Sequence, residues 1–176
     1  MTLLTFISCT KKQEQAHSLK PLSTLKLKYA QGFSVEEYKD YKEVIVFSPW
    51  KKGEIYARYY LVKDEKTKTP DDGIKLKIPL KTLASTSVTH LEFLSLLDEI
   101  QTITGVCSPA LIYNPELQKN IQAGKITDLG DAFSLNVEKT LLIKPGALMT
   151  SGFNQADAAA QRIAQAGIPV IFNNEW

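Results

Sequence analysis

The stretch from Gly130 to Gly152 constrains the fold most, because it predicts a helix that leads into a strand through a very short connection. Asn136 is a typical N-cap, Lys144-Pro145 ends the helix, and Ala147 to Thr150 forms a short strand that breaks at Ser151-Gly152. A helix joined so tightly to a strand is one step of a parallel α/β sheet. The loop before the helix and the break after the strand then lie at the same end of the sheet, where ligands of open α/β folds bind.

Strand and helix signals alternate through residues 80–176. Further strands are predicted over three short apolar segments, at Thr82-Leu83-Ala84, Thr102 to Val106 and Ile168 to Phe172. Helices are predicted to begin at Thr89, which has capping-box spacing to Glu92, and at Asn114, and an Ala-rich helix is predicted over Asn154 to Ala166. This alternation predicts an α/β fold, a doubly wound and mostly parallel sheet in a single lobe.

Residues 28–79 show a different pattern, which is typical of antiparallel strands with one solvated face. Four strand signals are present, at Tyr29 to Val35, Val44 to Phe47, Ile55 to Val62 and Ile74 to Ile78. The charged tract Lys63 to Gly73 predicts a hairpin tip between the last two strands. We therefore predict an antiparallel β-hairpin extension that precedes the lobe. Trp50 is interpreted as a packing anchor beside a turn, with ligand stacking as the alternative.

Residues 1–27 are interpreted as a lipoprotein signal remnant followed by a tether. An apolar stretch, Leu3 to Ser8, ends at Cys9 and is followed by polar residues, which resembles the end of a bacterial lipoprotein signal. Cys9 would then be the lipidated residue of a membrane-anchored periplasmic lipoprotein. The alternative is a frayed apolar start with a free thiol. With Cys9 used in this way, Cys107 has no partner for a disulfide.

The charge balance argues against nucleic acid as the main partner. The 176 residues contain 21 Lys and Arg against 19 Asp and Glu, a formal net charge of +2. Duplex binding normally requires a clustered basic face. The sequence contains no apolar run long enough to span a bilayer.

Five short motifs resemble, in the same order, those of the substrate-binding proteins that serve ABC importers of iron siderophores, haem and cobalamin. The motifs are Leu83 to Phe93, Ile103-Thr104-Gly105-Val106, Tyr113-Asn114-Pro115-Glu116, Asn136-Val137-Glu138 and Ala166 to Val170. Each motif is weak by itself, and their order is the stronger signal. The chain departs from the family pattern at His90, and at Ala132 it lacks the Trp of cobalamin-binding members.

The resemblance implies a binding protein with two α/β lobes joined by one long helix. Residues 80–176 would form its N-terminal lobe, with the C-terminal lobe absent. The implied ligand is a metal chelate, namely cobalamin, a ferric siderophore or haem, which is delivered to an ABC permease. The membrane is a further expected partner, through the lipid anchor. The prediction includes no reaction, no cofactor, no protein-bound metal and no nucleic-acid partner.

The ligand site is expected where the loops that follow the strands meet. The residues predicted to line it with hydroxyl, aromatic and amide groups are Ser85, Ser87, Thr89, Tyr113, Phe133, Ser151 and Asn154. Each could instead be an ordinary core or cap residue. The resemblance also implies that Glu138 docks on arginines of the permease. Glu138 could also be a first-turn carboxylate that stabilises the helix dipole, and the two roles are compatible.

The sequence contains few of the motifs that indicate an enzyme. It contains no dinucleotide-binding, phosphate-loop or nucleophile-elbow motif and no paired-Cys zinc spacing. His17 and His90 are the two histidines, which excludes a histidine cluster for zinc. The alternative that stays open is a small α/β enzyme that uses Cys107, or His90 with Glu92, at the same loop face.

Overall fold

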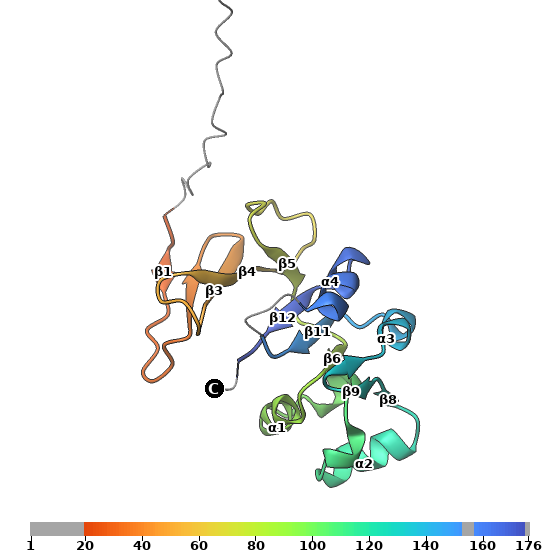
Figure 1. The fold of residues 1–176 in the computed structure, drawn as a ribbon. Coiled ribbons are helices and arrows are strands. Elements are labelled where there is room, and N and C mark those ends of the chain that lie inside the picture. Colours follow the sequence, from red (N-terminus) through yellow and green to blue (C-terminus); the bar gives the residue numbers. More distant parts are fainter. Residues whose placement is uncertain (1–19, 153–156, 175–176) are drawn as a thin grey trace, which may run out of the picture.

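The computed structural model describes residues 20–152 and 157–174 (Figure 1). The predicted lipidation site Cys9 and the predicted ligand residue Asn154 lie outside these residues. The described chain forms two five-stranded sheets and a small two-stranded hairpin. We name the sheet of β1 to β5 sheet A, and the sheet that contains β6, β7, β8, β11 and β12 sheet B.

Sheet B has the strand order β12-β11-β6-β7-β8, and all of its neighbouring strands are parallel. Its strands span Leu83–Ser85 (β6), Ile103–Val106 (β7), Thr127–Asp128 (β8), Ala147–Thr150 (β11) and Val170–Phe172 (β12). The chain starts in the centre at β6, runs outward to β8 and then crosses back to β11 on the other side of β6. The predicted doubly wound α/β lobe is confirmed, and its topological switch point lies between β6 and β11.

Four helices connect these strands within the described residues. They span Val88–Leu96 (α1), Pro115–Gln122 (α2), Val137–Ile143 (α3) and Ala158–Gln165 (α4), with 3₁₀ turns at Ile100–Thr102 (η1) and Pro109–Leu111 (η2). The side chains of Asn114 and Asn136 cap α2 and α3 as predicted, by accepting backbone N–H groups of the first turn. The predicted start of α1 is wrong, because Ser87 is the N-cap and accepts the N–H of Thr89.

The helices divide between the two faces of sheet B (Figure 1). Leu148 of β11 belongs to a core with Ile163 of α4 and with side chains of α3. Val106 of β7 belongs to a second core with Leu91 of α1 and Leu117 of α2. This second core lies against the β7–β8 half of that face of sheet B. The half formed by β6, β11 and β12 is therefore left for an element other than α1 and α2 to cover.

Sheet A begins earlier than predicted and ends with a strand of unexpected direction. Its strands span Ser23–Thr24 (β1), Phe33–Glu37 (β2), Tyr41–Phe47 (β3), Ile55–Val62 (β4) and Ile74–Lys77 (β5). Strands β1 to β4 are antiparallel as predicted, and β1 lies inside the predicted tether. Strand β5 is parallel to β4, so residues 63–73 cross back along the sheet and are not a hairpin tip. The alternation of apolar and polar residues predicts which side chains of β5 face inward. It does not predict the direction in which the strand runs.

Sheet A covers the half of sheet B that α1 and α2 leave bare. Tyr59 of β4 and Leu76 of β5 share a buried cluster with Leu83 of β6 and Ala147 of β11. The hydroxyl of Tyr59 also accepts the backbone N–H of Phe172 at 2.8 Å, at the edge strand β12. The extension is therefore a structural layer of the lobe.

We expect Tyr59→Phe to destabilise the protein by about 1 kcal/mol, because the Phe172 N–H loses its acceptor. Burial raises the pKa of Tyr59 to about 12, whereas an unfolded tyrosine titrates near ~10. The difference in free energy of unfolding between the wild type and Tyr59→Phe is therefore fully present below pH ~10, and it shrinks as the pH rises toward ~12. Urea unfolding of both proteins from pH 7 to pH 12 measures this difference. A constant difference across that range would contradict the assignment.

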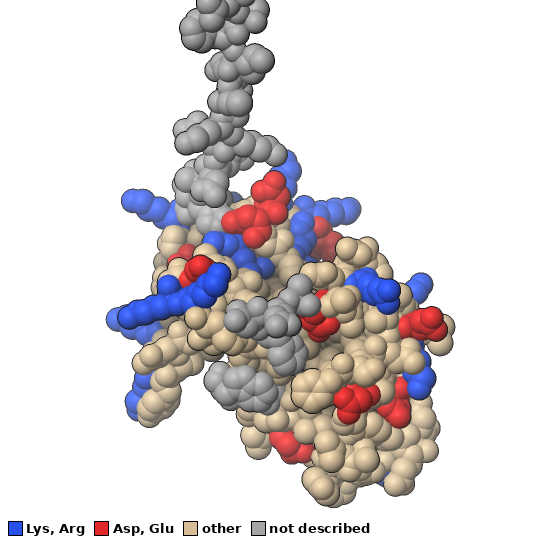
Figure 2. Space-filling view, viewed as in Figure 1, with Lys and Arg blue, Asp and Glu red and all other residues tan. Residues whose placement is uncertain are grey.

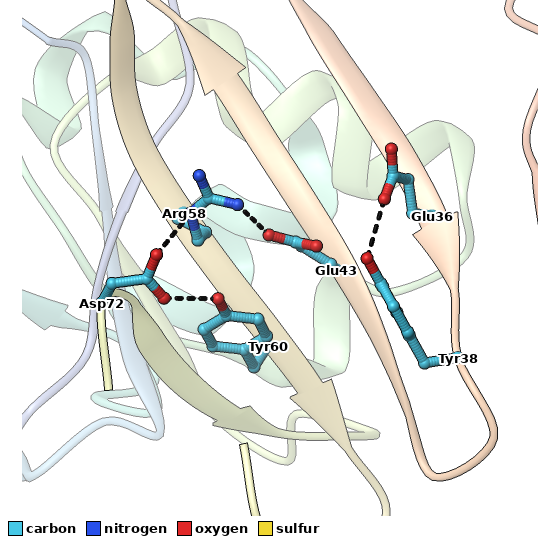
Figure 3. A network of polar contacts seen from close by, with 6 residues as sticks. All are labelled: Glu36, Tyr38, Glu43, Arg58, Tyr60 and Asp72. Carbon is cyan, nitrogen blue, oxygen red and sulfur yellow. Dashed lines mark hydrogen bonds and ion pairs between the residues drawn. The ribbon is translucent and has the colours of Figure 1, made fainter. Parts of the chain in front are cut away.

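The opposite face of sheet A carries a polar network (Figure 3). The guanidinium of Arg58 binds the buried carboxylate of Glu43 and lies 3.4 Å from Asp72. Tyr60 donates its hydroxyl to the same Asp72 at 2.6 Å, and burial raises the Tyr60 pKa far above its usual value. Because these residues come from β3, β4 and the loop before β5, the network fixes three adjacent segments of sheet A.

Candidate functional site

The strand ends of sheet B meet at one rim, which we define as the loops that follow β6, β7, β8 and β11. At the switch point the hydroxyl of Thr86 donates to that of Thr150 at 2.9 Å, and the Thr86 N–H donates to the carbonyl of Met149 at 3.0 Å. The Cys107 N–H donates to the Ser85 carbonyl at 3.1 Å. These contacts join the ends of β6, β7 and β11, as parallel strands require.

A short hairpin extends the rim beyond β8, where the sequence predicted only a loop. Its strands are Gly130–Asp131 (β9) and Ser134–Leu135 (β10), and Phe133 lies at its tip with 87% of its surface exposed. The Phe133 N–H donates to the carboxylate of Asp131 at 2.9 Å, which closes the turn. The hairpin thus places an exposed aromatic side chain on the rim.

Ser108 anchors this hairpin and was missed by the sequence analysis. Its N–H donates to the carbonyl of Gly130 at 2.7 Å, and its hydroxyl contacts Asp131 Oδ2 and the Ala132 N–H at 3.3 Å each. Ser108 also has a left-handed backbone with φ of 50°. The position of Ser108 just after a predicted strand could have marked it as a rim residue. Its contact with Asp131, 23 residues later, could not be inferred from the sequence.

The predicted hydroxyl donors after β6 differ in their exposure. Ser85 is buried, and its hydroxyl contacts the Ser87 carbonyl at 3.0 Å and His90 Nδ1 at 3.2 Å. His90 is also buried, and its Nε2 lies 3.0 Å from the carbonyl of Asn173, after β12. Ser85 therefore supports the rim from inside, whereas Thr89 is exposed and Ser87 is half-buried at the surface.

Tyr113 lies away from the switch point. It is 86% exposed, and the neighbouring Asn114 donates its side-chain amide to Ser95 Oγ at 3.1 Å, in the last turn of α1. Because Ser87 is the N-cap of α1, Ser95 lies about 12 Å further along the helix axis. We therefore leave Tyr113 out of the proposed ligand site.

The rim loop after β11 is closely packed. Ser151 is buried, and the Gly152 N–H donates to Asn174 Oδ1 at 2.6 Å. A Cβ at Gly152 would lie 2.8 Å from the Tyr56 ring, so a side chain there would displace it. Tyr56 also packs edge-on against Trp50 and Phe172, with ring centroids 5.3 and 5.0 Å away. These contacts agree with the interpretation of Trp50 as a packing anchor.

The described rim loops carry carboxylate but no Lys or Arg. Asp131 is exposed beside Phe133, and Asp128 lies at the end of β8. On the face drawn in Figure 2, Lys and Arg gather mainly over the part where sheet A lies, and the part around α1 and α2 is largely uncharged. Within residues 20–152 and 157–174, no group of three or more His, Cys, Asp or Glu is placed to hold a metal ion. An anionic ligand would find no positive side chain on these loops.

The residues of the enzyme alternative are not assembled into a site. Cys107 is buried in the core on the α3–α4 side of sheet B, whereas His90 belongs to α1 on the other side. Burial, and then the charges of Asp128 and Asp131, raise the pKa of the Cys107 thiol to about 12. Such a thiol is not a nucleophile at neutral pH. Glu92 is exposed on the surface of α1.

Glu138 lies exposed in the first turn of α3. This position suits the helix dipole, and exposure is required for docking on a partner. Its neighbour Lys139 donates Nζ to the carbonyl of Asp128 at 3.0 Å, which holds the start of α3 beside the end of β8.

No family model and no curated protein sequence matches the chain. Two of the solved structures that resemble it are binding proteins. The triscatecholate siderophore binding protein FeuA from Bacillus subtilis matches at 25% identity and a TM-score of 0.46, over 63% of this chain and 38% of its own. The iron uptake ABC transporter substrate-binding protein PiuA from Streptococcus pneumoniae matches at 15% identity and a TM-score of 0.41, over 60% of this chain and 35% of its own. Both neighbours belong to the class that the motifs resemble.

The matched part of the chain thus corresponds to less than half of either binding protein. In the described residues, no helix combines the length and apolar character needed to cross a membrane.

Proposed function

We propose that this chain is a ligand-binding lobe of the substrate-binding component of an ABC importer for an iron chelate. The observation that carries the proposal is the rim, where the loops after four parallel strands lie at one edge of sheet B and the exposed Phe133 is at the tip of one of them. The order of the five sequence motifs supports it, because these motifs fall on strands of sheet B or at its strand and helix junctions. Thr89, Ser87 and Phe133 are proposed to contact the ligand, together with Asn154.

The charges of the rim favour a chelate that is neutral or nearly so. A ferric tris-catecholate is strongly anionic, and the described rim loops offer it Asp131 and no positive side chain. A ferric tris-hydroxamate carries little net charge and avoids this repulsion. Cobalamin and haem remain alternative ligands. Titration of the same protein with each candidate ligand distinguishes them by their affinities.

The proposal assigns two further roles that follow the sequence motifs. Glu138 is proposed to dock on the permease, for which its exposure on α3 is suitable. Cys9 is proposed as the lipidated residue that holds the protein at the membrane on the periplasmic side, and mass spectrometry of the protein from its native membrane tests this assignment.

We expect Phe133→Ala to weaken binding of a ferric tris-hydroxamate about three- to tenfold, because an exposed aromatic anchor is lost. Isothermal titration of the full chain measures the change, with haem, cobalamin and a ferric tris-catecholate in the same panel. Leu142→Ala is the matched control, since Leu142 is 81% exposed on α3 and is not part of the rim. Equal affinities of the Phe133→Ala and control variants would contradict the proposed site.

A further inference from the structure

A cavity of about 510 Å³ lies between the two sheets, near the ends of β11 and β12. Phe33 and Val46 of sheet A line one wall, and Met149 and Ile171 of sheet B line the other. Strand β3 has an irregular register between Val46 and Phe47, where its pairing with β4 shifts. The space between the sheets is therefore not filled by side chains at this end of the interface.

The cavity has hydrogen-bonding groups at defined positions. Asn174 uses its Oδ1 to accept the Gly152 N–H, which leaves its amide NH₂ to serve as a donor. Asn173 directs its amide nitrogen toward the sulfur of Met149 at 3.9 Å, which leaves its Oδ1 to serve as an acceptor. The two amides thus add a donor and an acceptor to a lining that is mainly apolar and also contains Gln31 and Ser48.

The lining carries no charge. Among the described residues that line the cavity there is no Lys, Arg, His, Asp or Glu. A charged ligand would lose its hydration without gaining an ionic partner, which is costly. The volume lies within the range of about 300–1,000 Å³ that is usual for small-molecule sites. Charge and size together fit an uncharged small molecule.

We propose that this cavity binds a neutral, mainly apolar small molecule that has a hydrogen-bonding group at one end. The site is distinct from the iron-chelate rim, because none of the described residues proposed to contact the chelate, Ser87, Thr89 and Phe133, line it. The inference depends only on the two-sheet interface and stands or falls independently of the importer proposal.

Fluorescence titration of the full chain with N-phenyl-1-naphthylamine tests the inference. We expect saturable binding of this neutral probe, and binding at least about tenfold weaker for the anionic analogue 8-anilinonaphthalene-1-sulfonate. Absence of saturable binding by the full chain would overturn the proposal, including the case in which another segment of the chain fills the cavity. Tighter binding of the sulfonate would also overturn it.

Two variants locate the probe. Val46→Trp fills the cavity from the inner face of β3, and Ile45→Trp is its control, because Ile45 is the next residue and points to the other face of sheet A. Gly32→Phe adds a ring at the wall in a position with no atom within 4 Å of its Cβ, so it does not strain the core. We expect Val46→Trp and Gly32→Phe to weaken probe binding about tenfold or more, and Ile45→Trp and Phe133→Ala to leave it unchanged. Unchanged binding in Gly32→Phe would contradict the site.

Discussion

Replacing Leu76 by alanine is expected to lower the free energy of unfolding by about 2–5 kcal/mol, the usual cost of a large cavity in a core. Leu76 is 3% exposed and belongs to the cluster that joins sheet A to Leu83 and Ala147 of sheet B. The loss should reach the whole lobe, because sheet A is the layer that shields β6 and β11 from water. Urea unfolding gives the free energy, and amide hydrogen exchange in β6 and β11 shows whether sheet B is weakened with it.

Lys77→Ala is the matched control for Leu76→Ala. Lys77 is the next residue of β5, its side chain is exposed on the other face, and its ion pair with Glu65 at 3.4 Å lies at the surface. Such a pair contributes at most about 1 kcal/mol. If Leu76→Ala destabilised sheet A and left exchange in β6 and β11 at wild-type rates, the extension would be a separate unit and our description of the layers would be wrong.

Reversal of the charge at Glu138 is expected to reduce chelate uptake in a reconstituted importer about 30-fold or more. If Glu138 pairs with an arginine of the permease, Glu138→Arg replaces an attraction by a repulsion, which costs at least about 2 kcal/mol of docking free energy. Chelate affinity should stay at the wild-type value, because Glu138 is not proposed to contact the ligand. The measurement therefore needs both uptake by proteoliposomes and ligand titration of the same variant.

Glu116→Arg controls for the general effect of charge reversal at a helix start. Glu116 is also an exposed carboxylate in the first turn of a helix, α2, so both variants lose a similar interaction with the helix dipole. Uptake at wild-type level in Glu138→Arg, or an equal loss in both variants, would contradict a specific docking role for Glu138.

The features of the fold that the sequence predicted best are those set by neighbouring residues, such as strand ends and helix caps. The strand Ala147–Thr150 has its predicted bounds, and Asn114 and Asn136 cap helices, because strand breaks and caps depend on neighbouring residues. The direction of β5 and the role of sheet A as a layer depend on contacts between distant segments. The same holds for His90, which is buried between Ser85 and Asn173, residues that lie 88 positions apart in the sequence.

The candidate site divides in the same way. The parallel topology could be inferred from the alternation of helices and strands, so the location of the rim at the strand ends was predictable. Which of its residues are exposed was not predictable, since Ser85 at the end of β6 is buried and Phe133 between β9 and β10 is exposed. The β9–β10 hairpin, held by Ser108, decides the exposure of Phe133 and has no strong local signal.

The most direct test of the account uses the paramagnetism of ferric iron. The ¹⁵N-labelled full chain is titrated with a ferric tris-hydroxamate, and the gallium chelate of the same ligand serves as the diamagnetic control. We predict that the amide signals of Thr89, Ser108, Phe133 and Gly152 broaden with iron and not with gallium, because these residues surround the rim. Broadening confined to the outer face of sheet A, or no broadening at saturating chelate, would contradict the proposal that the rim binds an iron chelate.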